Sequence, residues 1–233
     1  MKNSYWKEEK RWKKGIERTL LFWHGKLPSK ANQFNHPFPL PAYFGEMIGD
    51  EKEVSIADLG AGVVATTGNT WEGVKIDLHP SDLFADEFAK EYEYWGITPL
   101  FPIEKQDMEH LTYGDETFDI VHCVNALDHC VHPYQAISEM LRICKKGGWI
   151  YLRHYRNEGL GKKYTLMHQW NICKENEDCR IWNDSHSFLL SMLDTRFDTA
   201  NKKIAEFDKR FDTLDLTKVT NNLDVVVSTL HKI

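Results

Sequence analysis

The sequence predicts an α/β fold in which a mostly parallel β-sheet carries helices on both faces, with a cap of helix and loop at the N-terminus. Two observations support this prediction. From Val54 onward, short apolar runs typical of strands alternate with segments of helical periodicity, and such alternation forms parallel sheets through right-handed crossovers. In addition, a glycine-rich turn, Gly60-Ala61-Gly62, directly follows the first of these runs.

Length and composition indicate one large hydrophobic core. The 233 residues are 42% hydrophobic, which is too apolar for a disordered chain, and no apolar run approaches the roughly 20 residues of a membrane span. The charged start, Met1 to Lys14, lacks the apolar stretch of a signal peptide. The five cysteines form no C-x-x-C pair, which favours reduced thiols. We therefore expect a cytoplasmic location and no membrane partner.

The charge is unevenly distributed along the chain. Residues 1–30 contain nine of the 29 Lys and Arg and three of the 35 Asp and Glu, so the remainder is strongly acidic. An acidic body repels phosphate backbones, and nucleic acid is not expected as a partner. The basic N-terminal arm is either a solvated helix face or a contact for an anionic partner.

The first fifty residues are predicted to form a helical arm and a proline-rich cap. The arm is a helix around Trp6 to Trp23, and Pro28 to Pro41 is expected to be a loop because prolines remove backbone donors. The aromatic pairs Trp23-His24 and Tyr43-Phe44 either close over a crevice or pad the flank of the sheet. Residues 51–233 are assigned to a single domain, with substrate-side elements at about 160–220.

Strands and helices follow in order along the chain. Pro102 cannot donate to a ladder, so its strand is expected at a sheet edge. Pro133 is suited to the first turn of a helix, and Gly147-Gly148 is expected to end that helix. The segment Ser191 to Thr220 is expected to be partly helical and to form a lid or a dimer contact. The predicted strands are 54–58, 73–77 (ended by Pro80), 101–105, 118–124, 149–154, 180–182 and 225–227, and a further helix starts near Asp82.

The turn Gly60-Ala61-Gly62 is the most informative feature for function. Together with Val63 to Ala65 it satisfies the G-x-G-x-x-G/A dinucleotide pattern, which alone is a weak signal. Two features oppose a nicotinamide cofactor. Asp58 precedes the turn, where an acid would repel a pyrophosphate, and Thr66 to Thr70 is poor helix material, so no long helix dipole faces phosphates.

Three acids at successive strand ends describe a different ligand. Asp58 suits a cationic group, Asp77 a ribose diol, and Asp107 an adenine amino group, with Met108 against the ring. Because ligands bind at the carboxyl ends of open α/β sheets, we expect these three carboxylates to share one crevice. A ligand with an adenosine and a positive charge fits S-adenosylmethionine.

Longer motifs resemble those of a class I S-adenosylmethionine-dependent methyltransferase over residues 54–155. They include Gln106 to Leu111, Gly114 to Val121, Asn125 to His129, His132-Pro133, Glu139 to Arg142 and Lys146 to Gly148. The resemblance implies a Rossmann-like fold with a seven-stranded sheet. The short crossover after Gly62 and the insertion before the last strand depart from the pattern. The residues that the resemblance and the strand ends assign to the cofactor are Asp58, Gly60, Ala61, Gly62, Asp77, Leu78, Asp107, Met108, Asn125 and Ala126.

A base is needed if the methyl acceptor must lose a proton, and histidine is the natural candidate. His129 and His154 follow the fourth and fifth strands and are expected to face the cofactor crevice, with His168 as a third candidate. Each has a structural alternative: His129 caps or packs a helix, His154 satisfies a buried backbone group, and His168 only packs.

The residues expected to bind substrate are Tyr43, Arg153, Arg156, Gln169 and Trp170. The two arginines suit a phosphate or carboxylate, although Arg156 also fits a plain surface position. No metal site is predicted, because the spacing of Asp128, His129, His132 and His154 matches no ligand motif.

We therefore expect an enzyme that transfers a methyl group from S-adenosylmethionine to a small polar acceptor, leaving S-adenosylhomocysteine. Oxygen is preferred over nitrogen as the acceptor atom. Two segments, residues 168–171 and 181–183, resemble bacterial methyltransferases that modify surface polysaccharides and sugars. This resemblance points to a sugar, a phosphate-bearing metabolite or a phosphoramidate as the acceptor. The alternatives are a nicotinamide-dependent oxidoreductase, a non-catalytic adenosyl-binding module, and a methyltransferase of protein or tRNA. A monomer or a homodimer is expected.

Overall fold

The computed structural model describes residues 2–176, 178–192, 203–207 and 225–232. Its main sheet has the strand order β3-β2-β1-β4-β5-β10-β9. The strands β1, β2, β3, β4 and β5 are parallel to one another, and β10 is antiparallel to its neighbours β5 and β9. This confirms the mostly parallel sheet. The strands are β1 (Glu53–Leu59), β2 (Lys75–Asp82), β3 (Glu104–Lys105), β4 (Phe118–Val124), β5 (Cys144–Tyr155), β9 (Lys203–Phe207) and β10 (Val225–His231).

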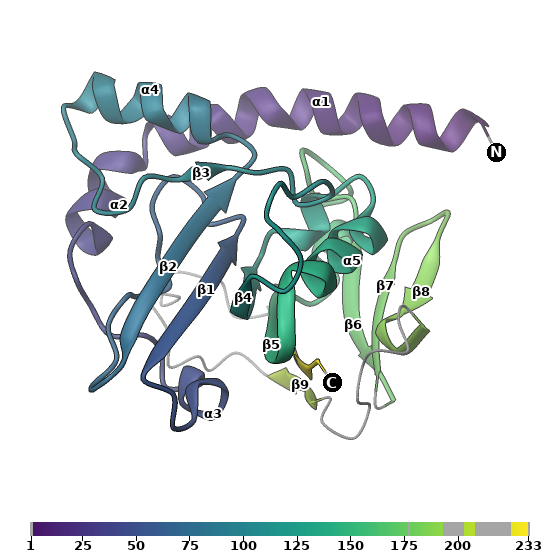
Figure 1. Ribbon diagram of the computed structural model, residues 1–233. Coiled ribbons are helices and arrows are strands. Elements are labelled where there is room, and N and C mark those ends of the chain that lie inside the picture. Colours follow the sequence, from purple (N-terminus) through teal and green to yellow (C-terminus); the bar gives the residue numbers. More distant parts are fainter. Residues whose placement is uncertain (1, 177, 193–202, 208–224, 233) are drawn as a thin grey trace.

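A separate antiparallel sheet and several helices surround the main sheet. Figure 1 shows α1 running along the edge at which β1 and β2 end. The small sheet comprises β6 (Asn171–Glu175), β7 (Asp178–Trp182) and β8 (Ser187–Leu189), followed by the 3-10 turn η2 (Leu190–Met192). The helices are α1 (Lys2–His24), α2 (Leu27–Phe34), α3 (Phe44–Ile48), α4 (Ala85–Trp95), α5 (Pro133–Ile143) and α6 (Glu158–Gly161), with a 3-10 turn η1 (Leu127–His129).

Three apolar clusters hold these layers together. One packs the apolar stripe of α5, including Ile137 and Met140, against β4, β5 and the small sheet. A second packs α3 against the opposite face, and a third joins α2 and α4 to half-buried residues of α1 such as Trp12 and Trp23. The long basic helix is thus held on the domain by its aromatic side chains.

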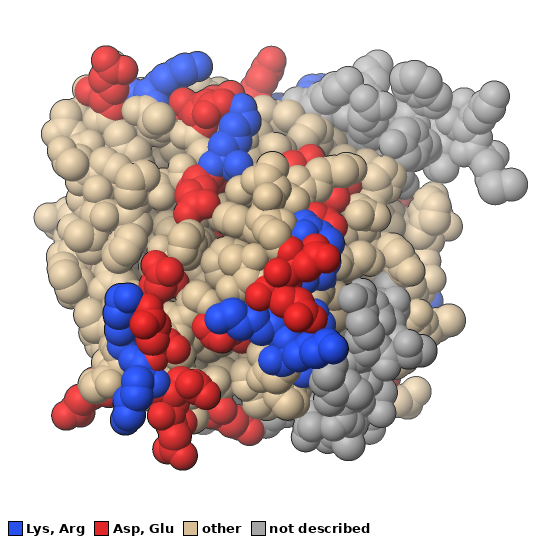
Figure 2. Space-filling view, in the orientation of Figure 1, with Lys and Arg blue, Asp and Glu red and all other residues tan. Residues whose placement is uncertain are grey.

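Basic and acidic side chains lie next to one another on the face seen in Figure 2. Exposed ion pairs such as Lys75–Glu53 and Arg142–Asp115 follow this arrangement. Among the residues that the structure describes, no helix is both long and apolar enough to cross a membrane.

Two helix predictions are wrong at the level of single residues. The expected loop over Pro28 to Pro41 begins with α2, because Pro28 falls in the first turn of that helix, where the missing N–H removes no bond. Gly147 and Gly148 do not end α5, which ends at Ile143. They lie inside β5, where Gly147 has φ +75° and the register with β4 shifts.

The other strand predictions are largely confirmed. The third strand is at the sheet edge, as Pro102 indicated, although only Glu104 and Lys105 pair. β7 and β10 occupy the predicted positions. Within the predicted partly helical segment 191–220, residues 193–202 and 208–220 lie outside the described residues, and residues 203–207 form β9 rather than helix.

Candidate cofactor and active site

The turn after β1 is built so that only glycine fits at two of its positions. Gly60 and Gly62 have φ of +71° and +73°, in the left-handed region that glycine favours. A Cβ on Gly60 would lie 2.3 Å from Cβ of Ala126, and one on Gly62 would lie 3.0 Å from the ring of Trp23. The backbone N–H groups of Gly60 and Ala61 both donate to the carbonyl of Ser81, at 2.8 and 2.9 Å, which anchors the turn to β2.

A cavity opens beside this turn at the carboxyl edge of the sheet. Its empty volume, including the space open to solvent at its mouth, is about 770 Å³. We call it the first cavity. Its lining is mainly apolar, with Trp12 and Trp23 contributed by α1. The candidate cofactor-binding and catalytic residues in its lining are Gly60, Asp82, Asp107, Met108, Ala126 and His129.

Asp82 ends β2 and lines the first cavity. Its two carboxylate oxygens accept hydrogen bonds from the backbone N–H groups of Gly62 and Phe84, each at 3.0 Å. Burial raises the pKa of Asp82, while these N–H donors oppose the rise. The carboxylate is therefore fixed between the glycine turn and the start of the next segment.

The prediction that Asp77 ends its strand is wrong. Asp77 is the third residue of β2, with a side chain 59% exposed and 3.3 Å from His79, and it does not line the first cavity. Pro80 does not end the strand. Backbone groups of neighbouring residues in a strand point to opposite sides, and the carbonyl of Ser81 points to β1. The backbone of Pro80 therefore points away from β1, to the side on which β3 pairs with β2 only from Ser81 onward. Its missing N–H thus removes no ladder hydrogen bond. Leu78 is likewise a core residue away from the first cavity.

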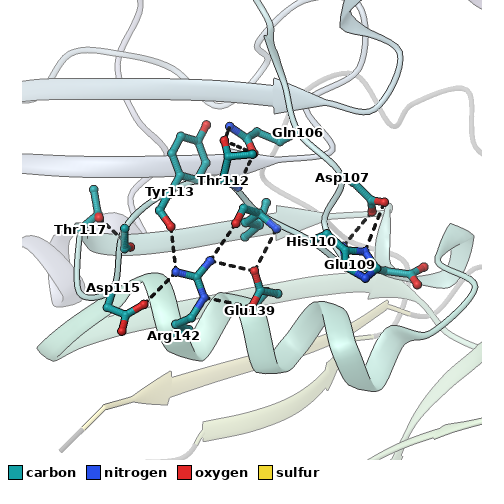
Figure 3. A network of polar contacts seen from close by, with 12 residues as sticks. Gln106, Asp107, Glu109, His110, Thr112, Tyr113, Asp115, Thr117, Glu139 and Arg142 are labelled. Atoms are coloured by element: carbon teal, nitrogen blue, oxygen red, sulfur yellow. Dashed lines mark hydrogen bonds and ion pairs between the residues drawn. The ribbon is translucent and has the colours of Figure 1, made fainter.

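The loop after β3 carries Asp107 and Met108 into the first cavity, and a network behind it holds its shape (Figure 3). Asp107 accepts a hydrogen bond from the N–H of Glu109 at 2.9 Å. Arg142 of α5 donates to the carbonyls of Leu111 and Tyr113 and to the carboxylate of Glu139. The loop is thus clasped to the helix that follows β4.

The same loop also caps α5. The Glu109 carboxylate accepts from the N–H groups of Val131 and His132, at 2.6 and 3.0 Å, just before the helix begins at Pro133. Backbone donors at a helix start otherwise lack partners. The cofactor-side loop and the turn that carries His129 are therefore mutually positioned.

A second, more polar cavity adjoins the first around the glycine turn. Both are lined by Gly60, Gly62, Asn125 and Trp23. Lys30, Tyr43, Asp58, Ala61, His122 and Arg153 line only the second cavity. Two cavities with different linings therefore meet at one backbone turn.

Asp58 is the first member of a buried chain of hydrogen bonds in the second cavity. Its carboxylate accepts from Thr67 Oγ1 at 2.7 Å and pairs with His122 Nδ1 at 2.8 Å. The other ring nitrogen of His122 lies 3.0 Å from the Tyr43 hydroxyl, and burial raises the pKa of that phenol well above its usual range. Tyr43 also stacks on Tyr151, with ring centroids 4.3 Å apart.

The three predicted carboxylates do not share one crevice. Asp107 lines the first cavity, Asp58 the second and Asp77 neither. The convergence of strand ends is nevertheless present, because Asp82 takes the place expected for Asp77 and the two cavities adjoin.

The three predicted base candidates occupy different environments. His129 lines the first cavity. His168 does not line this cavity but packs against His129, with the centroids of the two imidazole rings 4.7 Å apart. His154 lines neither cavity: it is 2% exposed, neither ring nitrogen has a hydrogen-bond partner, and burial lowers its pKa to about 4. The structure therefore does not bring His154 to the crevice.

Asp128 joins His129 and His168 in one cluster. Asp128 Oδ2 is 2.7 Å from His168 Nδ1 and 3.7 Å from His129 Nε2, and the two ring nitrogens are 3.2 Å apart. Asp128 is buried, and both imidazoles are half-buried.

The predicted substrate residues divide in the same way. Tyr43 and Arg153 line the second cavity, and Arg156 is exposed away from both. Gln169 and Trp170 were expected to bind substrate, but both are buried and line neither cavity. The N–H of Gln169 donates to the Asp128 carbonyl at 3.0 Å, and the Trp170 indole donates to the Cys130 carbonyl at 2.9 Å, so both residues anchor the turn that holds His129.

Sequence reasoning did not identify Asp82, His122 or Trp12. Asp82 had a usable signal, because an acidic residue about 20 positions after a glycine turn is the usual ribose partner in dinucleotide folds, and Asp82 is 20 residues after Gly62. His122 and Trp12 carried none. His122 is part of an apolar strand, and Trp12, whose indole donates to the His129 carbonyl at 2.7 Å, is one aromatic among many in the arm.

Comparison with known proteins gives an independent line of evidence. Residues 57–152, fewer than half of the chain, match the family model of a methyltransferase domain. A ubiquinone biosynthesis O-methyltransferase of Nitrosomonas europaea is 27% identical over 134 residues, covering 54% of this chain and 54% of the relative. A phosphatidylethanolamine N-methyltransferase of Cereibacter sphaeroides is 34% identical over 59 residues, covering 25% of this chain and 29% of the relative.

Among solved structures, a phosphoethanolamine N-methyltransferase 2 of Haemonchus contortus, in complex with phosphomonomethylethanolamine and S-adenosylhomocysteine, shares the fold. Its TM-score is 0.55 at 13% sequence identity, covering 82% of this chain and 51% of that one. The chain spans about half or less of the length of the curated relatives it matches. The mostly parallel sheet order and the glycine turn agree with this family match, so residues 57–152 resemble a methyltransferase domain in both sequence and fold.

Proposed function

We propose that this chain transfers a methyl group from S-adenosylmethionine to a small polar acceptor. The observation that carries the proposal is the pair of adjoining cavities around Gly60 and Gly62, one lined by apolar and acidic residues and one by residues of both charges. S-adenosylmethionine has the same two parts, an adenosine and a zwitterionic amino acid, joined at the sulfonium.

The first cavity is proposed to hold the adenosine. The Asp82 carboxylate, fixed by two backbone N–H groups, is suited to accept hydrogen bonds from the ribose diol. Asp107 is suited to accept from the adenine amino group, with Met108 and Ala126 against the ring. The apolar side chains of this cavity suit the purine ring, and its carboxylates suit the polar groups of the nucleoside.

The second cavity is proposed to hold the methionine end of the cofactor. Asp58 offers a buried negative charge for the ammonium group, while Lys30 and Arg153 offer positive charge for the carboxylate. Asn125, which lines both cavities at the carboxyl end of β4, would then lie beside the sulfonium.

The transfer itself is an in-line displacement in which the acceptor atom, the methyl carbon and the sulfur are aligned. The positive charge of the sulfonium disappears, so a dry site that aligns the groups can supply much of the rate. The apolar side chains that α1 and Met167 contribute to the lining would shield the reacting groups from water once the ligands are bound. We place the deprotonation of the acceptor beside His129, the predicted base that lines this cavity.

For the acceptor, we propose a hydroxyl of a sugar or of a phosphate- or phosphoramidate-bearing metabolite in surface-polysaccharide biosynthesis. Support for this class comes from the sequence resemblance around His168 and Trp182. The names of the relatives include both O- and N-methyltransferases, so product analysis decides the atom. A nicotinamide cofactor is disfavoured, because residues 63–72, all described, contain no helix whose N-terminus could face a pyrophosphate.

The decisive experiment compares two aspartates of one strand. Asp82→Asn is expected to weaken S-adenosylmethionine binding by about 10- to 100-fold, because ligand hydroxyls lose a charged acceptor. Asp77→Asn, at the exposed position, serves as the matched control and should bind normally. Calorimetric titration measures both. Equal affinity of the two variants would contradict the ribose role of Asp82, and transfer of labelled methyl to a panel of sugar and phosphate acceptors tests turnover.

A further inference from the structure

We propose that Asp128, His129 and His168 bind a divalent first-row transition cation at the wall of the first cavity, where it would coordinate the acceptor hydroxyl. This deepens the proposed function and rests on it for the acceptor. The three side chains offer ligand atoms that all lie within 4.8 Å of one another. They converge as a triangle with sides of 2.7, 3.2 and 3.7 Å.

The size of this triangle suits a cation. Imidazole nitrogens and carboxylate oxygens bind zinc-like ions at about 2.0–2.2 Å, so ligands spaced by 90–110° lie roughly 3.0–3.4 Å apart. The observed distances bracket this range. Shifts of a few tenths of an ångström would therefore bring all three atoms to bonding distance.

Hydrogen bonding alone accounts poorly for the arrangement. His168 Nδ1 faces both the Asp128 oxygen and the His129 ring nitrogen. A neutral imidazole nitrogen carries either one proton or one lone pair, so it can donate to Asp128 or accept from His129, and one of the two contacts stays weak. A cation satisfies all three atoms, because each then contributes a lone pair. The same reasoning disfavours a proton relay, which would use opposite nitrogens of the His168 ring.

The surrounding backbone holds the three ligands in place without the cation. The segment that carries His168 is joined to the turn that carries Asp128 by the Gln169 N–H bond to the Asp128 carbonyl and the Trp170 bond to the Cys130 carbonyl. Trp12 of α1 fixes the carbonyl of His129 from the other side, at 2.7 Å. Ligands from two distant segments are thus brought together by contacts independent of their side chains.

The ligand set indicates the class of ion and its function. Two imidazoles and one carboxylate suit Zn²⁺, Fe²⁺, Co²⁺ or Mn²⁺ rather than Mg²⁺ or Ca²⁺, and three protein ligands leave coordination positions open. Because His129 lines the first cavity, an open position on the side of His129 would face that cavity. A bound cation lowers the pKa of a coordinated hydroxyl. The acceptor proton then passes to bulk water, the O–CH₃ bond forms as the S–CH₃ bond breaks, and the sulfur keeps the electron pair.

Cobalt binding to the whole chain tests the site directly. After dialysis against a chelator, the protein is titrated with Co²⁺, followed by visible absorption, and with Zn²⁺, followed by calorimetry. We expect one equivalent of each to bind. Asp128→Asn and His168→Gln should each weaken binding on the order of 100-fold or more, because each removes a ligand. His36→Ala, which removes an exposed imidazole that contacts Pro37 and Phe38, is the matched control and should bind as the wild type does.

Two further measurements separate this proposal from the proposed function. S-adenosylhomocysteine affinity and thermal unfolding show whether the variants fold, since Asp128 and His168 do not line the first cavity. Absence of stoichiometric cation binding in the wild type, or equal binding in both ligand variants, overturns the cation site and leaves methyl transfer standing. Cation binding without any binding of S-adenosylmethionine overturns the proposed function and leaves the cation site. Full methyl transfer in excess chelator overturns the assigned action of the cation on the acceptor.

Discussion

The two cavities at the carboxyl edge of the sheet differ in how their polar groups are fixed. In the first, Asp82 and Asp107 are fixed by backbone N–H groups of the glycine turn and of the residues that follow each aspartate. In the second, Asp58 is fixed by side chains, through Thr67 and His122, and His122 continues to Tyr43. The first cavity thus depends on loop shape, and the second depends on the identity of a few buried residues.

This difference indicates which half of a ligand each cavity can select. Backbone-held carboxylates in an apolar slot accept hydrogen bonds from a neutral nucleoside without large changes in charge. A buried aspartate with cationic residues nearby is costly unless a charged group completes it, so the second cavity favours a zwitterion. Substitutions that separate the two halves are therefore the sharpest tests.

The largest effect is expected at the turn that both cavities share. Gly60→Ala places a Cβ 2.3 Å from that of Ala126, in a backbone with φ +71°, so the turn must move. A cost of about 3 kcal/mol or more corresponds to at least a 100-fold loss of S-adenosylmethionine affinity. Calorimetric titration measures it.

Gly73→Ala is the matched control for this change. Its φ of +73° imposes the same backbone strain, but its Cβ would meet nothing within 4 Å. It should cost about 1 kcal/mol in unfolding free energy and leave ligand affinity unchanged. Similar affinities for the two alanine variants would show that the close approach at Gly60 does not matter.

A moderate effect, restricted to one half of the ligand, is expected from Asp58→Asn. Removing the buried charge should weaken S-adenosylmethionine binding by about 10-fold, since a charge-assisted hydrogen bond contributes roughly 1.5–3 kcal/mol. Binding of 5′-methylthioadenosine, which lacks the amino-acid end, should stay within about twofold. Asp82→Asn should weaken both ligands, and an equal loss of both ligands in Asp58→Asn would refute the division of the site.

The first half of the site could be largely inferred from the sequence, because its parts are local. A glycine turn after a strand, and an acid after the next, follow from spacing along one segment. The error at Asp77 arose because a proline such as Pro80 usually marks the end of a strand. Only the pairing of β3 with β2 shows that the missing N–H of Pro80 breaks no hydrogen bond. The sheet itself was predictable for the same reason, since each strand is a continuous apolar run.

The hydrogen-bonded pairs that support the two cavities were beyond sequence reasoning, because their members are distant in the chain. The contact of His168 with Asp128 spans 40 residues, and that of Tyr43 with His122 spans 79. No periodicity encodes such pairs. The buried Trp170 shows the same limit, since an aromatic beside a candidate base fits a cavity wall as well as an anchor for a turn.

The smallest effect is expected from Glu139, which acts on the first cavity only through the loop clasped by Arg142. The Arg142 hydrogen bonds lower the pKa of Glu139, so the carboxylate stabilises the fold above its unfolded pKa of about 4.3, and this contribution is lost as pH falls through the folded value. Glu139→Gln should therefore lower the unfolding free energy by about 1 kcal/mol at pH 7 and by less at pH 3.5.

Urea unfolding at the two pH values measures the Glu139 effect, with the exposed Glu93→Gln as its control. Because the clasp supports the loop of Asp107 and touches nothing in the second cavity, 5′-methylthioadenosine and S-adenosylmethionine should lose affinity equally, by about twofold. A destabilisation that grows on acidification would mean that Glu139 is protonated more readily in the fold than in the unfolded chain. The clasp would then not be an ion pair, and the loop would depend on its other hydrogen bonds, such as the one that the Thr112 N–H donates to the side-chain oxygen of Gln106.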